Sequence, residues 1–460
     1  MSYLVQCLKQ VRKEPVRPLH FGKVKSVVGL LIEARQINAA LGELCYIYEH
    51  EGAGSRRIKA EVVGVRDDTA VLMPLEETHG LRTGCLVQRS ALPLTVPVGE
   101  ALLGRIIDGN GRPLDDKGPL ALLEEQPVHR EPPSPLKRHM VDTALATGIR
   151  AIDTFLTLGR GQRIGIFAGS GVGKSTLLGM LARSTRADVN IIALIGERSR
   201  EVQEFIVDTL GEEGLSRSVV VAVTGDQAAM SRVKGAGVAM ALAEYFRDQG
   251  KNVLLMMDSV TRVAMAQREI GLAVGEPPTT RGYTPSVFAL LPRLLERAGP
   301  GTQGTITGIF TVLVDGDDMN EPVGDAVRGI LDGHIVLSRK LAHANHFPAI
   351  DVLQSVSRVM PRVVSPEARA TADEARRLLA VYQEAEDLIR VGAYEPGSNP
   401  ETDRAIALHG ALRAFLRQGV EDPPVTDPVP ELRRLLDQQA AVPARAQGPA
   451  AGGRIAKKGP

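Results

Sequence analysis

The stretch AGSGVGKST, Ala168–Thr176, lies between the apolar run QRIGIF and the segment LLGMLARSTR. Its glycines at 169, 171 and 173 allow a tight turn whose backbone N–H groups point inward and bind phosphate oxygens. Lys174 would then reach the β- and γ-phosphates of a nucleotide, and the Ser175 hydroxyl would ligate Mg²⁺. The spacing fits a phosphate-binding loop of the form [AG]-x4-G-K-[ST], with Ala168 where glycine is more usual.

The flanking residues support this interpretation. Gln162–Phe167 has the apolar character of a buried strand, and Lys174–Ala187 has its leucines and Met180 at helical spacing. The phosphate would therefore lie at a helix N-terminus, where the dipole and free N–H groups favour an anion. The residues expected to contact the nucleotide here are Gly169, Ser170, Gly171, Val172, Gly173, Lys174, Ser175 and Thr176.

Length, composition and cysteine content set limits on the kind of protein. A chain of 460 residues suggests roughly three domains, and a net charge of +1 gives no global basic field for nucleic acid. No apolar run reaches the roughly 18 uncharged residues that a membrane span needs, and MSYLVQCLKQVRKEP is too short and polar for a signal peptide. Cys7, Cys45 and Cys85 lack metal-ligand spacing. These features predict a reduced, cytosolic protein.

Hydrophobic periodicity divides the chain into five segments. Residues 1–20 predict an amphipathic docking helix with Leu4, Val5, Leu8 and Val11 on one face, and short strands between turns predict a β-barrel over residues 22–95. Strands alternating with helices predict an α/β nucleotide-binding ATPase domain with a parallel sheet over residues 96–365. Residues 366–437 have helical periodicity and predict a C-terminal helical domain, and residues 438–460 predict a disordered tail.

Carboxylates at two strand ends complete the predicted chemistry. Asp258 ends the apolar strand NVLLMMD and is the candidate Mg²⁺ ligand together with Ser175, although an aspartate there could also cap the next helix. Glu197 ends the strand NIIALIG and could orient a water for attack on the γ-phosphate, and the adjacent Arg198 could touch that phosphate. A structural carboxylate paired with Arg198 or Arg200 is the alternative for Glu197.

These motifs carry a resemblance to a known family. PAIDVLQSVS, Pro348–Ser357, fits the signature P-[SAP]-[LIV]-[DNH]-x3-S-x-S of the rotary-ATPase alpha/beta superfamily. The segments GEPPTTRGYTPSVFALLPRLLERAG and DGDDMNEPVGDAVRGILDGHIVLSR resemble the type III protein-export ATPases within it. NVLLMMDSVTR and VYQEAEDLIRVGAYEPGSNPETDRAI resemble the flagellum-specific branch, and the resemblance covers nearly the whole chain.

The resemblance implies roles that the residues alone do not give. It implies a RecA-like core, ATP and Mg²⁺ as ligands, Glu197 as the catalytic carboxylate and Phe347 packed on the adenine ring. It implies that Arg358 is an arginine finger supplied to a neighbouring subunit, with Arg339 a weaker contender. It also implies a homohexamer at the inner face of the cytoplasmic membrane, with an export gate, a central stalk protein, export chaperones and substrates, and a stator-like negative regulator at the N-terminus as partners.

Four alternatives remain to be weighed. A nucleic-acid translocase would need a basic groove with stacking aromatics in its barrel, whereas residues 22–95 hold nine Lys or Arg, nine Asp or Glu and only two aromatics, Tyr46 and Tyr48, without basic neighbours. A non-catalytic ring subunit would lack Lys174, Glu197 or Asp258. An ATP-synthase catalytic subunit shares the chemistry but not the export-type segments. A virulence injectisome ATPase shares nearly every motif with the flagellar branch and is the main alternative.

Overall fold

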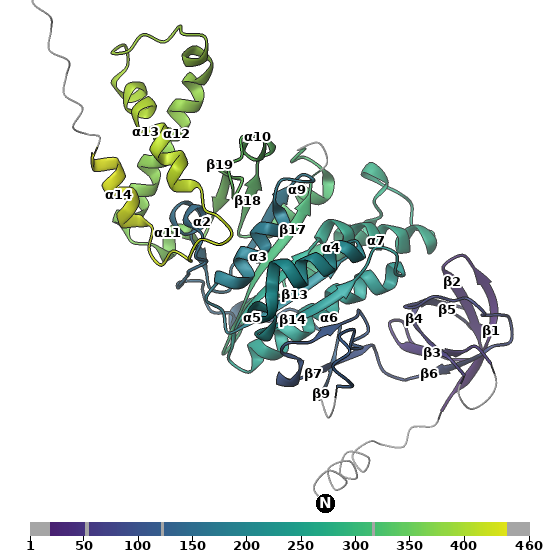
Figure 1. Ribbon diagram of the computed structural model, residues 1–460. Coiled ribbons are helices and arrows are strands. Elements are labelled where there is room, and N and C mark those ends of the chain that lie inside the picture. Colours follow the sequence, from purple (N-terminus) through teal and green to yellow (C-terminus); the bar gives the residue numbers. More distant parts are fainter. Residues whose placement is uncertain (1–18, 51–54, 121–123, 315–317, 439–460) are drawn as a thin grey trace, which may run out of the picture.

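The computed structural model describes residues 19–50, 55–120, 124–314 and 318–438. Figure 1 shows three units, with a barrel and a helical unit at opposite ends of a central sheet. Within these ranges no helix combines the length and apolar character needed to cross a membrane. The docking helix predicted for residues 1–20 and the tail predicted for residues 438–460 lie outside the described residues, except for their inner ends.

The first unit is a closed antiparallel barrel, as predicted. Its strands follow the order β1-β2-β5-β4-β3-β6 around the barrel. They are β1 (Phe21–Val28), β2 (Leu31–Arg35), β3 (Leu44–Tyr48), β4 (Arg57–Arg66), β5 (Thr69–Pro74) and β6 (Leu86–Arg89). Alternate residues of β4, Ile58, Ala60 and Val62, are buried in the interior. The period of two in the sequence therefore follows from one face of each strand pointing inward.

One expectation for the barrel is wrong. The aromatics of β3 do have a basic neighbour, because the guanidinium of Arg57 lies 5.7 Å from the ring centroid of Tyr46. Arg57 opposes Tyr48 in the β3–β4 pairing and is two residues before Lys59, which opposes Tyr46. A diagonal neighbour of this kind depends on strand register, which the sequence alone did not supply.

The connection between the barrel and the phosphate loop contains short elements that were not expected individually from the sequence. They are β7 (Thr95–Val98), η1 (Glu100–Leu102), β8 (Ile106–Ile107), β9 (Glu124–Pro127), η2 (Pro135–Lys137), β10 (Ala144–Leu145) and β11 (Leu158–Gly159). β7 pairs with β9, and β10 pairs with β11. β8 pairs in parallel with β14 and becomes the edge strand of the core sheet. The connection therefore belongs partly to the core.

The central unit is a nine-stranded sheet with the order β19-β18-β12-β17-β15-β13-β14-β8, and β16 pairs on the side with β17. The long strands are β12 (Arg163–Ala168), β13 (Val189–Ile195), β14 (Ser218–Val223), β15 (Asn252–Asp258), β17 (Thr305–Leu313), β18 (Gly333–Leu337) and β19 (Ile350–Ser357), and β16 is Gly299–Pro300. From β18 to β8 the pairing is parallel, while β19 and β16 run antiparallel to their neighbours. The predicted parallel α/β core is confirmed.

Helices cover both faces of this sheet. They are α2 (Arg150–Phe155), α3 (Lys174–Ser184), α4 (Ser199–Glu204), the π-helix η3 (Phe205–Leu210), α5 (Gly211–Ser216), α6 (Ala229–Asp248), α7 (Val260–Ala273), η4 (Thr280–Gly282), α8 (Pro285–Leu295), α9 (Pro322–Ile330), α10 (Arg339–His343) and α11 (Met360–Val363). The helical segment SREVQEFIVDTL is divided between α4 and η3.

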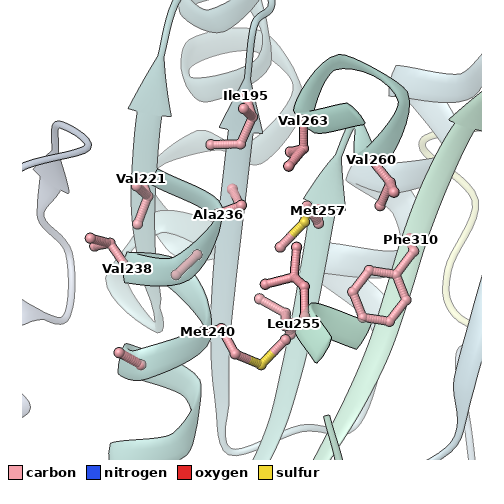
Figure 2. Packing of buried hydrophobic residues seen from close by; sticks show 14 of the residues in the cluster. Ile195, Val221, Ala236, Val238, Met240, Leu255, Met257, Val260, Val263 and Phe310 are labelled. Carbon is pink, nitrogen blue, oxygen red and sulfur yellow. The ribbon is translucent and has the colours of Figure 1, made fainter. Parts of the chain in front are cut away.

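Two hydrophobic clusters explain why the core strands are apolar without interruption. Leu255 and Met257 of β15 face Ala236 and Met240 of α6 in the first cluster (Figure 2). Their neighbour Met256 belongs to the second cluster, which contains the buried leucines of α3. Successive side chains of a strand point to opposite faces, and here both faces are covered.

The last unit is a set of helices, α12 (Pro366–Arg390), α13 (Pro400–Leu416) and α14 (Val429–Gln438). Side chains of Ser365 and Asn399 cap the first two by accepting backbone N–H groups of the first turn. Leu378 of α12 and Leu408 of α13 are buried in the same cluster as α2 and α3 of the core. The predicted C-terminal helical domain is therefore present and packed against the nucleotide-binding unit.

Candidate active site

The phosphate loop joins the end of β12 to the start of α3. Gly171 and Gly173 have φ angles of 77° and 90°, a backbone conformation that favours glycine. Lys174 is the first residue of α3, so the free N–H groups of the helix start face the loop. Ser170, Ser175 and Thr176 are exposed at the loop surface. The sequence motif thus has the strand–loop–helix context that phosphate binding requires.

Lys174 lies between two carboxylates. Its Nζ contacts Oδ1 of Asp258 and is 3.7 Å from Oε1 of Glu197. Asp258 Oδ1 also accepts a hydrogen bond of 2.7 Å from the hydroxyl of Thr311 on β17. The two carboxylates converge because β13 and β15 are parallel neighbours, and Leu194 pairs with Asp258. Asp258 does not cap the following helix, since the N-cap of α7 is Ser259.

Glu197 is buried, with 7% of its surface exposed, yet within the described structure its Oε1 accepts no hydrogen bond. Burial raises the pKa of this carboxyl, and the positive charge of Lys174 partly opposes that shift. A buried carboxylate oxygen without a donor is costly unless another group binds to it. The geometry leaves this oxygen available to accept a proton or a hydrogen bond from a water.

Arg262 is a site residue that the sequence analysis missed. It lies in the first turn of α7, and its Nε is 3.5 Å from Oε1 of Glu197. A Cβ atom on Gly196, whose φ is 75°, would lie 2.7 Å from Cδ of Arg262. Glycine at 196 therefore allows the arginine to approach Glu197. The available signal was the spacing, because Arg262 follows Asp258 by one helical turn at a strand-to-helix junction.

Arg198, the predicted γ-phosphate contact, lies at the surface of the site. It is the N-cap residue of α4, its side chain is 83% exposed, and Nη1 lies 3.6 Å from Glu201 Oε1. The side chain nevertheless lines the same cavity as the loop and Glu197. Arg198 is therefore at the entrance of the site, where an incoming phosphate could displace a weak surface ion pair.

The cavity has a volume of about 720 Å³, which is within the range for small-molecule sites. The loop from Ala168 to Thr176, apart from Val172, lines it together with Glu197, Arg262 and Arg268. Within the residues that the structure describes, no three His, Cys, Asp or Glu side chains gather as a metal cage. Mg²⁺ commonly uses one or two protein oxygens together with water and substrate phosphates, so the oxygens of Ser175 and Asp258 fit this ion.

Phe347 lies next to Gly173 of the loop and does not line the cavity. A Cβ on Gly173 would meet Cδ1 and Cε1 of Phe347 at 3.4 Å. The ring belongs to the segment between α10 and β19 and is 40% exposed. It therefore offers an aromatic face close to the start of α3, as the predicted base contact requires.

Arg358 does not belong to this cavity. β19 runs antiparallel, so Ile350 opposes Leu337 near the phosphate-loop edge while Ser357 opposes Gly333 at the other edge. Arg358 follows Ser357, and its N–H donates to the carbonyl of Asp332. Leu337 pairs with Ala168, and five strand residues separate it from Asp332, the residue at the level of Arg358. Arg358 is therefore roughly 17 Å along the strand direction from Ala168. Arg339 begins α10 at the loop edge, but it does not line the cavity.

Comparisons with known proteins agree on one family. The model of the ATP synthase alpha/beta family nucleotide-binding domain matches residues 148–357, that of its beta-barrel domain residues 24–91, and that of the T3SS EscN ATPase C-terminal domain residues 364–440.

Curated relatives are similar over most of their length. The flagellum-specific ATP synthase of Bacillus subtilis is 55% identical over 88% of this chain and 92% of its own. The type 3 secretion system ATPase of Xanthomonas euvesicatoria is 52% identical over 86% and 90%. Among solved structures, the assembled ATPase EscN of enteropathogenic E. coli has a TM-score of 0.85 and 47% identity, covering 90% of this chain and all of that one. EscN in complex with its central stalk EscO gives a TM-score of 0.83 at 47% identity, covering 91% and 99%.

Proposed function

The chain belongs to the ATP synthase alpha/beta family, within the flagellar and type III secretion ATPases, and we propose that it hydrolyses ATP to energise or prime export of flagellar proteins across the inner membrane. The observation that carries the proposal is Glu197 Oε1, a buried carboxylate oxygen without a donor in the described structure, 3.7 Å from the lysine of a phosphate loop. That arrangement suits activation of water beside a bound triphosphate.

Binding of the triphosphate uses the loop and the start of α3. Backbone N–H groups from Gly169 to Gly173 hold the phosphate oxygens, and Lys174 moves from its carboxylate partners toward the β- and γ-phosphates. Ser175 and Asp258 would hold Mg²⁺. When bound, that ion neutralises phosphate charge and keeps the β- and γ-phosphoryl groups in place for in-line attack.

Hydrolysis follows from the position of Glu197. Its carboxylate accepts a hydrogen bond from the attacking water and draws off the proton as the water oxygen approaches the γ-phosphorus. The bond from the γ-phosphorus to the bridging oxygen breaks, which releases ADP and phosphate. Arg262, 3.5 Å from the same carboxylate, is positioned to hold Glu197 or to contact a γ-phosphate oxygen.

Three further residues are assigned to the nucleotide base, the γ-phosphate and a neighbouring subunit. Phe347 packs on the adenine ring, and its exposed face beside Gly173 supports this assignment. Arg198 contacts the γ-phosphate from the cavity entrance. Arg358 acts across a subunit boundary, because the edge of the sheet that carries it is remote from its own phosphate loop.

Assembly and partners follow the relatives. EscN is described as assembled and in complex with a central stalk, so we propose a homohexamer with a central stalk partner for this chain. The export gate, export chaperones and substrates, and a stator-like regulator binding residues 1–20 complete the proposed set. These partners require a cytoplasmic protein that associates peripherally with the inner face of the cytoplasmic membrane.

Two measurements test the function. Purified protein should hydrolyse ATP in the presence of Mg²⁺, and Glu197→Gln should do so far more slowly. Absence of turnover by the assembled wild-type chain would contradict the activity. Expression in a motile bacterium that lacks its flagellar ATPase should restore swimming. The 52% identity to a type 3 secretion system ATPase makes the injectisome the second candidate. Restored effector secretion in an injectisome-ATPase deletion, without restored swimming, would favour that candidate.

A further inference from the structure

Gln418 links the C-terminal helices to the nucleotide-binding unit. It lies just after α13, and only 5% of its surface is exposed. Its backbone N–H donates to the carbonyl of Phe347 at 3.0 Å. Its side-chain Nε2 donates to the carbonyl of Gly148 at 2.8 Å, and its Oε1 accepts from the N–H of Arg150 at 2.9 Å. One residue therefore joins three segments that are far apart in the sequence.

These contacts are specific to a primary amide. Gly148 offers an acceptor and Arg150 offers a donor, so the side chain must present both an N–H and an oxygen. Burial of the amide means that either backbone group would be left without a partner if the side chain were apolar. A glutamate would keep the contact to the Arg150 N–H but would set two oxygens against each other at Gly148.

The segment after Gln418 lies at the C-terminal end of α3, the helix that follows the phosphate loop. The Arg183 side chain near the end of α3 donates to the carbonyl of Val420 at 3.1 Å. A Cβ on Gly148 would lie 2.8 Å from Pro424 and 2.9 Å from Ser184. At the other end of α3, the Phe347 ring lies next to Gly173. The Gln418 segment therefore contacts the end of α3 directly and its start through Phe347.

We propose that Gln418 is a positioning residue that fixes the Phe347 aromatic face relative to the phosphate loop and thereby sets the affinity for the base part of the nucleotide. This inference rests on the proposed function, in which Phe347 packs on adenine. Gln418 does not line the cavity beside the phosphate loop. Its hydrogen bond to the Phe347 carbonyl is therefore the link through which it acts.

The test compares ligands that use the base site with one that does not. Gln418→Met keeps approximate side-chain length and removes both side-chain hydrogen bonds. Calorimetry on the assembled protein should give a Kd for ATP that is weaker by about 3- to 10-fold, because the two side-chain bonds that hold Gln418, and through it Phe347, in place are lost while the contacts to ATP itself remain. The Kd of inorganic pyrophosphate, which engages the loop alone, should change by less than about 2-fold by the same reasoning, and kcat at saturating ATP should be nearly unchanged.

A double-mutant cycle tests whether Gln418 acts on ATP binding through Phe347. In a Phe347→Ala background, Gln418→Met should weaken ATP binding no further. Equal loss for ATP and pyrophosphate, or full additivity with Phe347→Ala, would overturn the inference. Because the experiment measures binding directly, the inference about Gln418 can fail while ATPase activity persists. Absence of turnover would instead count against the proposed function alone.

Folding needs its own control. Gln418→Glu keeps one hydrogen bond and should weaken ATP binding with the same selectivity as Gln418→Met. Asn190→Leu removes a buried amide whose hydrogen bonds go to the Ala182 carbonyl at 3.0 Å and the Ser218 hydroxyl at 3.3 Å, and not to the partners of Gln418. It should lower the melting temperature without changing the ratio of the two Kd values. The same ratio change in Asn190→Leu as in Gln418→Met would show a general effect of destabilisation and overturn the assignment.

Discussion

Lys174 Nζ lies 3.7 Å from Glu197 Oε1 while it contacts Asp258 on the neighbouring strand. One cation is therefore shared by two carboxylates for which we propose different roles. A γ-phosphate entering the loop competes with both carboxylates for the lysine. Glu197 then has a reduced interaction with Lys174 and a free oxygen at the point where water must be oriented.

Glu197→Gln should bind Mg-ATP but hydrolyse it at least about 100-fold more slowly, because the amide keeps the shape but removes the base. Single-turnover hydrolysis and equilibrium binding measure the two parts separately. Glu204→Gln on α4 changes an exposed carboxylate paired with Arg200 and serves as the matched control. Near-normal turnover in Glu197→Gln would refute the assignment.

Lys174→Ala should lose both ATP binding and turnover, since the loop then lacks its cationic contact to the β- and γ-phosphates. The substitution also leaves Asp258 and Glu197 without the cation between them, which adds to repulsion of the triphosphate. Titration with a fluorescent ATP analogue measures the loss. Lys340→Ala, which removes an exposed lysine paired with Glu386, should bind normally. ATP affinity retained in Lys174→Ala would contradict the role of the loop.

The raised pKa of Glu197 has a consequence for pH dependence. The base must be ionised to act, so kcat/KM should fall as pH decreases through the pKa of the folded protein, which burial places above 4.5. The raised value also means that the folded state binds this proton more tightly than the unfolded state, and ionised Glu197 therefore lowers the free energy of unfolding above that pKa.

Glu197→Gln should accordingly have a higher melting temperature than the wild type at neutral pH, and the difference should shrink as the pH is lowered toward 4.5. Thermal unfolding from pH 8 to 5, run beside a kcat/KM profile, checks both statements. An acidic limb centred at or below 4.5, or a less stable Gln variant at neutral pH, would show that the Lys174 charge outweighs burial.

Arg262→Ala should lower kcat by about 100-fold, the usual cost of one lost donor at developing charge, with a smaller change in ATP affinity. Arg262→Lys should restore only part of the rate, because a point charge cannot reproduce the guanidinium contacts. Steady-state kinetics gives kcat and KM separately. A loss confined to KM would indicate that Arg262 binds the ground state only.

The sequence predicted those site residues that parallel topology brings together. Glu197 and Asp258 were found because they end adjacent strands, and the carboxyl ends of parallel strands meet at one edge. Arg262 was missed because its contact depends on the rotation of α7 and on the open space at Gly196. Gln418 was missed because its partners are about 270 positions away in the chain.

The fold, too, was only partly predictable from the sequence. Hydrophobic period predicted the barrel, the parallel core and the helices, since each burial pattern follows from local geometry. The addition of β8 to the sheet edge and the π-helical turn at Phe205–Leu210 depend on tertiary packing. The Cβ that Gly179 of α3 lacks would lie 1.9 Å from Cγ2 of Thr209 in that turn, a close approach that no periodicity reveals.

The last prediction concerns Arg358 and subunit assembly. Arg358 lines a hollow of about 190 Å³ together with Arg362 and Arg163, at the sheet edge opposite its own loop. Developing charge on the γ-phosphoryl oxygens commonly needs an arginine from outside the loop, worth roughly 10³- to 10⁵-fold in rate. Head-to-tail contacts bring such an edge against a neighbour's site and close into rings.

Arg358→Ala should therefore bind ATP almost normally but hydrolyse it poorly, and specific activity of the wild type should rise with protein concentration. Mixing Arg358→Ala with Lys174→Ala, each nearly inactive alone, should restore part of the activity, because some interfaces pair an intact loop with an intact arginine. If native mass spectrometry shows that mixed rings form but the mixture remains inactive, action of Arg358 across the interface is excluded.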